Sequence, residues 1–178
     1  MKKGMILGRF QIFHNGHMRY LQEAMKNCYY MLIGITNPDP LRTSETEVAR
    51  HRSQPSANPF TYYERMKMIQ GVCKEVQLEH YDIVPIPLDF PEIIKYYVPR
   101  DILVMITVHD KWSLEKKSRL EQQGYEVKIL FEEYGQEKLS STFIRGLIEN
   151  GQEFAPYVPN SVYQYLLTLP YFPVRPVL

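Results

Sequence analysis

The chain has 178 residues, of which 44% are hydrophobic and 23% are charged. This composition is that of an ordinary globular protein and excludes an intrinsically disordered chain. The formal net charge is +1, which argues against a broad basic surface for nucleic acid.

The cysteines and the apolar runs indicate in which cellular compartment the protein is expected. Cys28 and Cys73 are the only cysteines, and neither has the spacing of a metal ligand. Both fall in predicted amphipathic helices, so we expect buried free thiols. No apolar run approaches the roughly 20 residues of a membrane helix, and the first apolar stretch is too short for a signal peptide. We therefore expect a cytoplasmic protein without a membrane partner.

The first half of the chain alternates short apolar runs with amphipathic segments. The pattern predicts a strand over 4–7, a helix over 16–28 and a strand over 30–35. Residues 37–59 have no period and contain four prolines, so we expect a long loop that is functional or mobile. The next helix should open at Asn58-Pro59, with Thr61 and Glu64 as a capping box.

The second half continues the alternation. We expect strands over 83–86, 102–106 and 126–131, helices over 91–97, 112–123 and 160–168, and a helix capped by Ser140 or Ser141. Such alternation predicts an α/β, Rossmann-like fold: a five-stranded parallel sheet with helices on both faces. We expect a single domain over 1–178, with its core at about 3–150 and a C-terminal helix and proline-rich tail over 151–178.

Ligands of such sheets bind at the carboxyl ends of the strands, where the first strand-to-helix junction lies. Gly8 ends the strand without a side chain that would obstruct a nucleotide, and Arg9 supplies a permanent charge. The helix that starts near Gly16 favours an anion, and His14 and His17 lie on one side of its entrance. A polyphosphate fits these donors, whereas incidental caps or a surface metal site are the alternatives that spacing leaves open.

The junction after the fifth strand carries a second set of phosphate donors. Ser141 and Thr142 start a helix, and Arg145 follows one turn later. Taken alone, this pattern fits a plain serine cap with a solvated arginine. Because both junctions should share one edge of the sheet, the pair together favours phosphate binding.

These motifs resemble a known family. The string G-R-F-Q-x-F-H-x-G-H with a later S-S-T-x-x-R is similar to the adenylyltransferases that make NAD from nicotinamide mononucleotide, within the H-x-G-H nucleotidyltransferase superfamily. The archaeal-type enzymes and a bacterial set fused to hydrolase domains look most similar. The stretch from Asn58 to Arg65 also resembles the N-P-F-T-x-x-E-R motif of that group, and the resemblance covers about residues 3–150.

The resemblance implies substrates and roles. ATP and nicotinamide mononucleotide would be the substrates, with Mg²⁺ held mainly by phosphate oxygens and no separate metal site. His14 and His17 would contact the phosphates and stabilise charge on the α-phosphate, while Arg145 and the helix start at Ser141 and Thr142 would hold the β- and γ-phosphates. The nucleotide cleft would be lined by Gly8, Arg9, Phe10 and Gly16.

The resemblance is less specific about the residues that bind the acceptor. Thr61 and Arg65 would help to shape it, and the acceptor base would stack on Phe90, Tyr96 or Trp112. Arg42, Arg50, His51 and Arg52 of the long loop would form a lid over the phosphates or stay solvated. A homo-oligomer is implied by the resemblance only.

Three departures from the family pattern concern the acceptor. Ile12 replaces the usual proline, Phe143 replaces a common glutamate, and 107–110 read T-V-H-D in place of T-R-N. Nicotinamide mononucleotide is the first expectation. Cytidylyl transfer to a sugar or alcohol phosphate, and a catalytically silent nucleotide sensor, are the alternatives.

Overall fold

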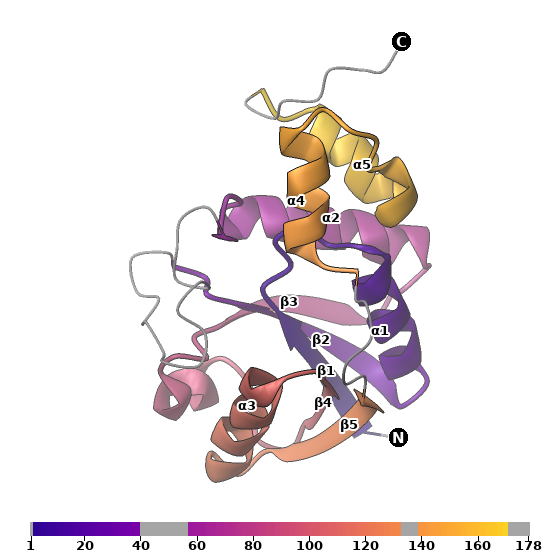
Figure 1. Cartoon of the computed structure of the whole chain (residues 1–178). Coiled ribbons are helices and arrows are strands. Elements are labelled where there is room, and N and C mark those ends of the chain that lie inside the picture. Colours follow the sequence, from indigo (N-terminus) through magenta and orange to yellow (C-terminus); the bar gives the residue numbers. More distant parts are fainter. Residues whose placement is uncertain (1, 40–56, 133–138, 171–178) are drawn as a thin grey trace.

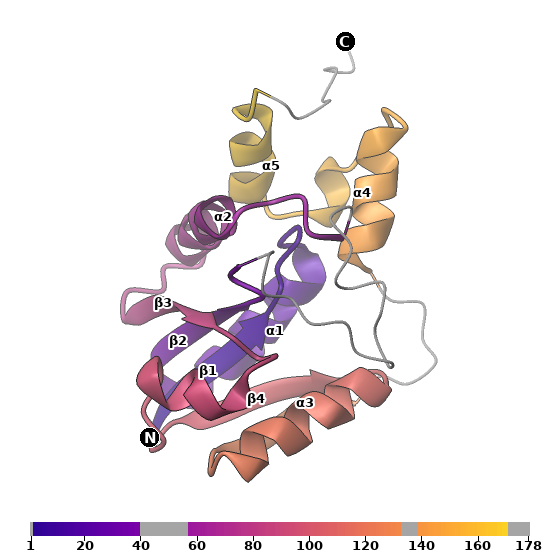
Figure 2. The same ribbon diagram turned by 90° about the vertical axis from the view of Figure 1, so that its left-hand side faces the viewer.

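The computed structural model describes residues 2–39, 57–132 and 139–170. Its centre is a parallel sheet of five strands in the order β3-β2-β1-β4-β5, with helices on both faces (Figures 1 and 2). The predicted fold class is therefore confirmed. The strands are β1 (Lys2–Gly8), β2 (Cys28–Thr36), β3 (Tyr81–Ile86), β4 (Leu103–Val108) and β5 (Glu126–Glu132).

Four α-helices lie on one face of the sheet, called here the first face (Figure 2). They are α1 (Asn15–Met25), α2 (Tyr62–Glu75), α4 (Ser141–Glu149) and α5 (Asn160–Leu167), and the short 3₁₀ helix η5 (Ala155–Tyr157) joins the last two. The apolar residues of this face form one cluster in which α5 packs on α2. Helix α5 is therefore part of the same core as the sheet.

The opposite face, called here the second face, carries η4 (Pro91–Tyr96) and α3 (Lys111–Gln122). The two faces separate along β1, where Ile6 packs in the first cluster and Met5 and Leu7 pack in the second. This alternation follows from the two-residue period of a strand. Because both faces are covered, β1 is apolar from Met5 to Leu7.

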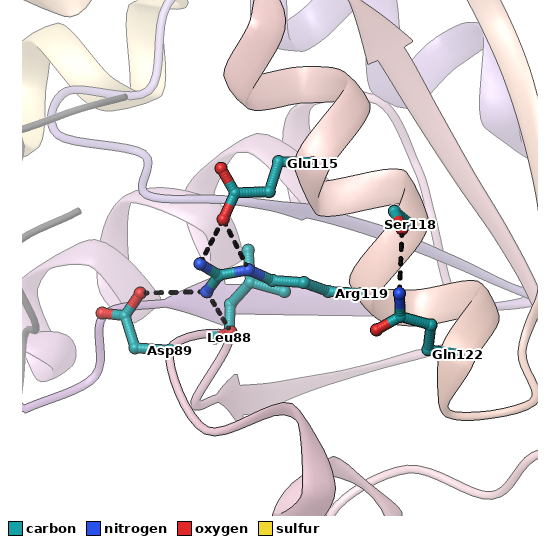
Figure 3. A network of polar contacts seen from close by, with 6 residues as sticks. All are labelled: Leu88, Asp89, Glu115, Ser118, Arg119 and Gln122. Atoms are coloured by element: carbon teal, nitrogen blue, oxygen red, sulfur yellow. Dashed lines mark hydrogen bonds and ion pairs between the residues drawn. The ribbon is translucent and has the colours of Figure 1, made fainter. Parts of the chain in front are cut away.

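A polar network joins α3 to the segment that follows β3 on the second face (Figure 3). The Arg119 guanidinium donates through Nε and Nη2 to the Glu115 carboxylate and through Nη1 to the Leu88 carbonyl at 3.2 Å. The same Nη1 lies 3.7 Å from the Asp89 carboxylate, and the guanidinium lies 5.0 Å from the centre of the Trp112 ring. Arg119 is thus partnered mainly by side chains.

The end of α1 differs from the prediction. The helix ends at Met25, and Cys28 begins β2 instead of continuing the helix. The Asn27 side chain donates to the Glu23 carbonyl at 2.9 Å, so it satisfies one of the last carbonyls of the helix and turns the chain toward the sheet. The expected helical position of Cys28 is wrong, but both cysteines are buried and free, as predicted.

Two other boundaries also differ. Helix α2 starts at Tyr62, later than expected, but Thr61 is its N-cap and the Thr61–Glu64 capping box is confirmed. Strand β3 begins at Tyr81, two residues before the predicted start, and Pro85 pairs within it. A proline is tolerated there because β3 is an edge strand.

Two predicted segments fall partly or wholly outside the described residues. Of the loop over 37–59, the stretch 40–56 lies outside them, and with it the expected lid residues Arg42, Arg50, His51 and Arg52. The tail over 171–178 also lies outside. Within the described part of the chain, every helix is too short or too polar to cross a membrane.

Candidate functional site

The two central strands part at the carboxyl edge of the sheet. β1 and β4 pair from Gly4 with Leu103 to Ile6 with Met105, and both strands then continue beyond this register. The Tyr20 hydroxyl of α1 donates to the Met105 carbonyl at this point. Strand order reverses between β1 and β4, which is where open parallel sheets bind ligands.

The first junction leaves β1 through a left-handed turn. Phe10 has a φ of 52°, a region that non-glycine residues seldom adopt. Its ring is only 1% exposed and stacks on Phe13 at 5.3 Å. A Cβ at Gly8 would lie 3.0 Å from the Phe10 ring, so the space beside Gly8 is filled by this ring and not left for a nucleotide. Phe10 can therefore border a ligand only through its backbone.

The two histidines form the entrance of α1. His14 is the N-cap, its Nδ1 accepts from the His17 amide at 3.4 Å, and the Nδ1 of His17 accepts from the His14 amide at 3.3 Å. The rings stack with centres 3.7 Å apart. A neutral imidazole that accepts at Nδ1 carries its proton on Nε2, so each ring presents an Nε2–H donor.

The environments of the two rings differ. His14 is 3% exposed, whereas His17 is partly exposed and is surrounded by Phe10 at 5.0 Å and Phe13 at 5.3 Å. A Cβ at Gly16 would lie 3.0 Å from the His14 ring, so the absence of a side chain there makes room for the histidine stack. His17 is thus the more exposed ring of the pair, and His14 stacks against it.

The start of α4 docks on this junction. Ser140 is the N-cap, and its Oγ accepts from the Phe143 amide at 3.2 Å. The Ser141 hydroxyl donates to the Ile12 carbonyl at 3.0 Å. Arg145 donates to the Gln11 carbonyl at 2.5 Å and to the Thr142 hydroxyl at 3.2 Å. The structure therefore brings Ser141, Thr142 and Arg145 together with the loop that carries the histidines.

Burial lowers the pKa of Arg145, and the nearby Glu149 carboxylate opposes this shift. A guanidinium stays charged at neutral pH despite such a shift. The site therefore has a fixed positive charge beside two helix N-termini, whose dipoles favour the same anionic ligands.

A third segment, which precedes α2, pairs with the same loop. The Gln11 side chain, 2% exposed, donates to the Phe60 carbonyl at 3.0 Å and accepts from the Phe60 amide at 2.9 Å. Arg9 donates to the Asn58 side chain at 3.4 Å. Sequence reasoning did not select Gln11, although it stands inside the string that carries the resemblance.

Arg65 has a different position from the one expected at an acceptor site. It is 1% exposed, and its guanidinium donates to main-chain carbonyls of the first junction, of the end of β2 and of α2. Burial lowers its pKa to about 10, and the nearby Tyr62 opposes this shift. These bonds use four of the five N–H donors of the guanidinium, so in this structure Arg65 mainly binds backbone. Thr61, the other expected residue, is exposed and caps α2.

The aromatic candidates for the acceptor lie on the second face. Trp112 is in the first turn of α3, directly after β4, while Phe90 precedes η4 and is 39% exposed. Tyr96 is at the far end of η4, is 76% exposed and has the Lys95 ammonium over its ring. Of the three, Trp112 alone follows the carboxyl end of a central strand.

The departures from the family pattern have structural roles. Asp110 is the N-cap of α3 and accepts from the amide and the hydroxyl of Ser113. Phe143 is 47% exposed and packs edge-on against Tyr157 of η5 at 5.3 Å. Ile12 is fully buried in the first core. Asp110, Phe143 and Ile12 are thus accommodated by a cap or by apolar packing.

The sequence profile of the cytidylyltransferase-like family matches residues 5–147, a range that contains all three motifs. The chain belongs to the cytidylyltransferase-like family. Two relatives align over most of both chains. It is 36% identical to the phosphonoformate cytidylyltransferase of Streptomyces viridochromogenes, covering 89% of this chain and 87% of the relative. It is 30% identical to the nicotinamide-nucleotide adenylyltransferase of Thermococcus onnurineus, covering 93% and 82%.

The fold agrees with a solved member of the wider group. The bifunctional NMN adenylyltransferase/ADP ribose pyrophosphatase of Francisella tularensis superposes with a TM-score of 0.56 at 17% identity. The match covers 94% of this chain and 50% of that protein, so this chain spans about half of it. The likeness establishes the Rossmann-like nucleotidyltransferase fold. The protein is thus a nucleotidyltransferase by family, as the motifs predicted.

Proposed function

We propose that the protein transfers the adenylyl group of ATP to nicotinamide mononucleotide, forming NAD and pyrophosphate. The observation that supports nucleotidyl transfer is the bond from Arg145 to the Gln11 carbonyl, which joins the α4 entrance to the loop of His14 and His17. Two helix N-termini and a guanidinium would then face one triphosphate. The name of the Thermococcus relative supports the choice of substrates.

The triphosphate is assigned to these donors. Arg145 and the amides at the start of α4 would hold the β- and γ-phosphates, because hydroxyls, helix amides and guanidinium all favour phosphate oxygens. The Nε2–H of His17 would donate to the α-phosphate, with His14 stacked behind it. Arg9 and the backbone of Gly8 and Phe10 would border the nucleotide.

The transfer step needs no general base. An oxygen of the acceptor phosphate attacks the α-phosphorus of ATP, the new P–O bond forms, and the bond to the bridging oxygen breaks with release of pyrophosphate. The acceptor oxygen is already an anion, so no proton has to be removed. Catalysis then consists of positioning two anions and of stabilising the charge that develops on the leaving group.

Magnesium would enter with the triphosphate, coordinated by phosphate oxygens. Among the described residues, no group of three or more His, Cys, Asp or Glu side chains gathers to hold a metal. Release of pyrophosphate should therefore stop when EDTA removes Mg²⁺ and resume when Mg²⁺ is restored.

Three further properties belong to the proposal. We infer one nucleotidyltransferase domain over 1–178, supported by the packing of α5 on α2 in the common core. We infer a cytoplasmic protein, supported by two buried free cysteines. We also infer a homo-oligomer, which light scattering of the purified protein would test.

Cytidylyl transfer is the second candidate, favoured by the relative from Streptomyces viridochromogenes. The acceptor would then be a phosphate or phosphonate in place of nicotinamide mononucleotide. The same donors at α1 and α4 would serve the triphosphate of CTP, because they bind phosphates and not the base. The site geometry is compatible with both nucleotides, so the two candidates differ in base and acceptor selection.

The test is a matrix of substrates. Purified protein is incubated with ATP or CTP and with nicotinamide mononucleotide, phosphonoformate or a sugar phosphate, and pyrophosphate is measured. We expect release with ATP and nicotinamide mononucleotide, with NAD as the second product. Release with CTP but not ATP would overturn the proposal in favour of the second candidate. Binding of ATP by calorimetry without pyrophosphate release in any pair would indicate a nucleotide sensor.

A further inference from the structure

Arg65 is a buried cation whose guanidinium binds backbone from three separate segments. Nη1 donates to the Arg9 carbonyl at 2.9 Å and to the Thr36 carbonyl at 2.8 Å, and Nη2 donates to the Asn37 carbonyl at 2.8 Å. Nε donates to the Thr61 carbonyl at 3.2 Å, one turn earlier in α2. A single side chain therefore links the ends of β1 and β2 to the start of α2.

The carbonyls that Arg65 binds flank two strained turns. Phe10, which follows Arg9, has a φ of 52°, and Asn37, which follows Thr36, has a φ of 50°. A left-handed conformation is unfavourable for a residue such as Phe10 and persists only where the surroundings hold it, whereas asparagine adopts it more readily. Burial of a charge is also costly. The presence of a buried guanidinium despite this cost agrees with a role in fixing the ends of β1 and β2.

One of these turns supports the candidate catalytic ring. The Phe10 ring packs edge-on against His17 at 5.0 Å and stacks on Phe13, which itself packs against His17. The conformation of Phe10 therefore helps to fix the His17 ring, which also stacks on His14. Arg65 acts on Phe10 through the carbonyl directly before it.

We propose that Arg65 is a positioning residue for nucleotidyl transfer: it fixes the turn at Phe10 and so holds His17 in place. This inference rests on the proposed function of His17, but its structural part does not depend on the identity of the substrates. Lysine at this position would keep the charge and reach one carbonyl, but it lacks the planar fork that binds three segments.

The test compares Arg65→Lys with Arg100→Lys. Arg100 is exposed and lies just before β4, at the amino edge of the sheet and away from the loop of the histidines. We expect Arg65→Lys to lower kcat by about 10- to 100-fold with KM for the triphosphate within about threefold, because small misplacements are costly in the transition state. Arg100→Lys should leave kcat unchanged. An unchanged kcat in folded Arg65→Lys would overturn the proposal.

A double-mutant cycle separates positioning from general destabilisation. If Arg65 acts through His17, the kcat of the double variant Arg65→Lys/His17→Ala should equal that of His17→Ala alone. Multiplicative losses in the double variant would show that Arg65 acts independently of His17 and would refute the proposal. Should Arg65→Lys fail to fold, Phe10→Leu takes its place in the same cycle, because it removes the ring contact with His17 while keeping an apolar side chain.

A spectroscopic readout separates this proposal from the proposed function. In protein with ¹³C-labelled histidine, the His17 signal is assigned from its loss in His17→Ala. We expect this signal to shift in Arg65→Lys and to keep its position in Arg100→Lys. The shift is independent of turnover, so it tests the positioning role even if no substrate pair releases pyrophosphate. An unshifted His17 signal in Arg65→Lys would refute the role.

Discussion

Arg65 and Arg119 lie on opposite faces of one sheet and hold their neighbours in different ways. Arg65 is 1% exposed and donates to four main-chain carbonyls. The Arg119 side chain is 19% exposed. It donates to the Glu115 carboxylate and forms an ion pair with the Asp89 carboxylate at 3.7 Å (Figure 3). The first arrangement fixes backbone, whereas the second fixes side chains at the edge of solvent.

The contrast extends to the residues around each arginine. On the first face, Gln11 pairs with the backbone of Phe60, and Arg145 and Ser141 bind backbone of the loop that carries the histidines. Bonds to backbone carbonyls persist whatever the side chains of those residues are. The first face, which carries the candidate site, is therefore fixed largely by buried hydrogen bonds to backbone between distant segments. The second face is held by an apolar cluster, with the partly buried ion pairs of Arg119 and the more exposed pair of Lys117 with Glu121 at its surface. Exposed pairs contribute little to stability.

The largest difference between the faces should be catalytic. We expect His17→Ala to lower kcat by about 10²–10³-fold, the range for removal of one transition-state donor. His80→Ala is the matched control, since this histidine is exposed at the start of β3 and should leave kcat unchanged. Steady-state assays of pyrophosphate release measure both. Equal kcat values in the two variants would remove His17 from the mechanism.

The next difference should appear in stability. Gln11→Leu leaves the buried amide and carbonyl of Phe60 without their partner and should lower the free energy of unfolding by about 1–3 kcal/mol. Gln122→Leu, at an exposed amide that donates to Ser118 at 3.2 Å, should change it by less than about 0.5 kcal/mol. Urea denaturation compares the pair. Similar losses in both would contradict the distinction between the faces.

The two faces should respond alike when a helix cap is removed, because a cap is a local interaction on either face. Thr61→Ala at α2 and Asp110→Ala at α3 each remove a side chain that accepts from an amide of the first turn. Both should lower the free energy of unfolding by about 1 kcal/mol. A loss confined to one helix, measured by urea denaturation, would mean that its cap also serves the tertiary structure.

The smallest effect is expected at an exposed ion pair of the second face. The Nζ of Lys117 lies 2.6 Å from the Oε1 of Glu121, which is one turn later on α3. Lys117→Met should change the free energy of unfolding by less than about 0.5 kcal/mol, and the difference should vanish at high salt because ions screen exposed charges. A larger loss that persists at 1 M salt would show that the lysine stem, and not its charge, stabilises the helix.

Local patterns predicted most of the elements and one side of the site. Apolar periodicity placed the five strands, and the Thr61–Glu64 spacing identified a true capping box. The spacing of His14 and His17 placed both rings at the start of α1. Some boundaries were predicted wrongly. Helix α1 ends early at a local cap by Asn27, and α2 starts at Tyr62 instead of Asn58, where Gln11, far away in sequence, pairs with the backbone of Phe60.

The sequence alone determined the elements, the parallel sheet and the family, because periods of two and 3.6 residues and a short phosphate-binding string are written locally. Only the tertiary structure decided that Phe10 is buried beside His17, that Gly8 and Gly16 lie against rings of the protein itself, and that Arg65 binds backbone. These outcomes depend on contacts between segments about 30 to 130 residues apart. No local period or spacing in the sequence predicts which side-chain donor binds which distant carbonyl.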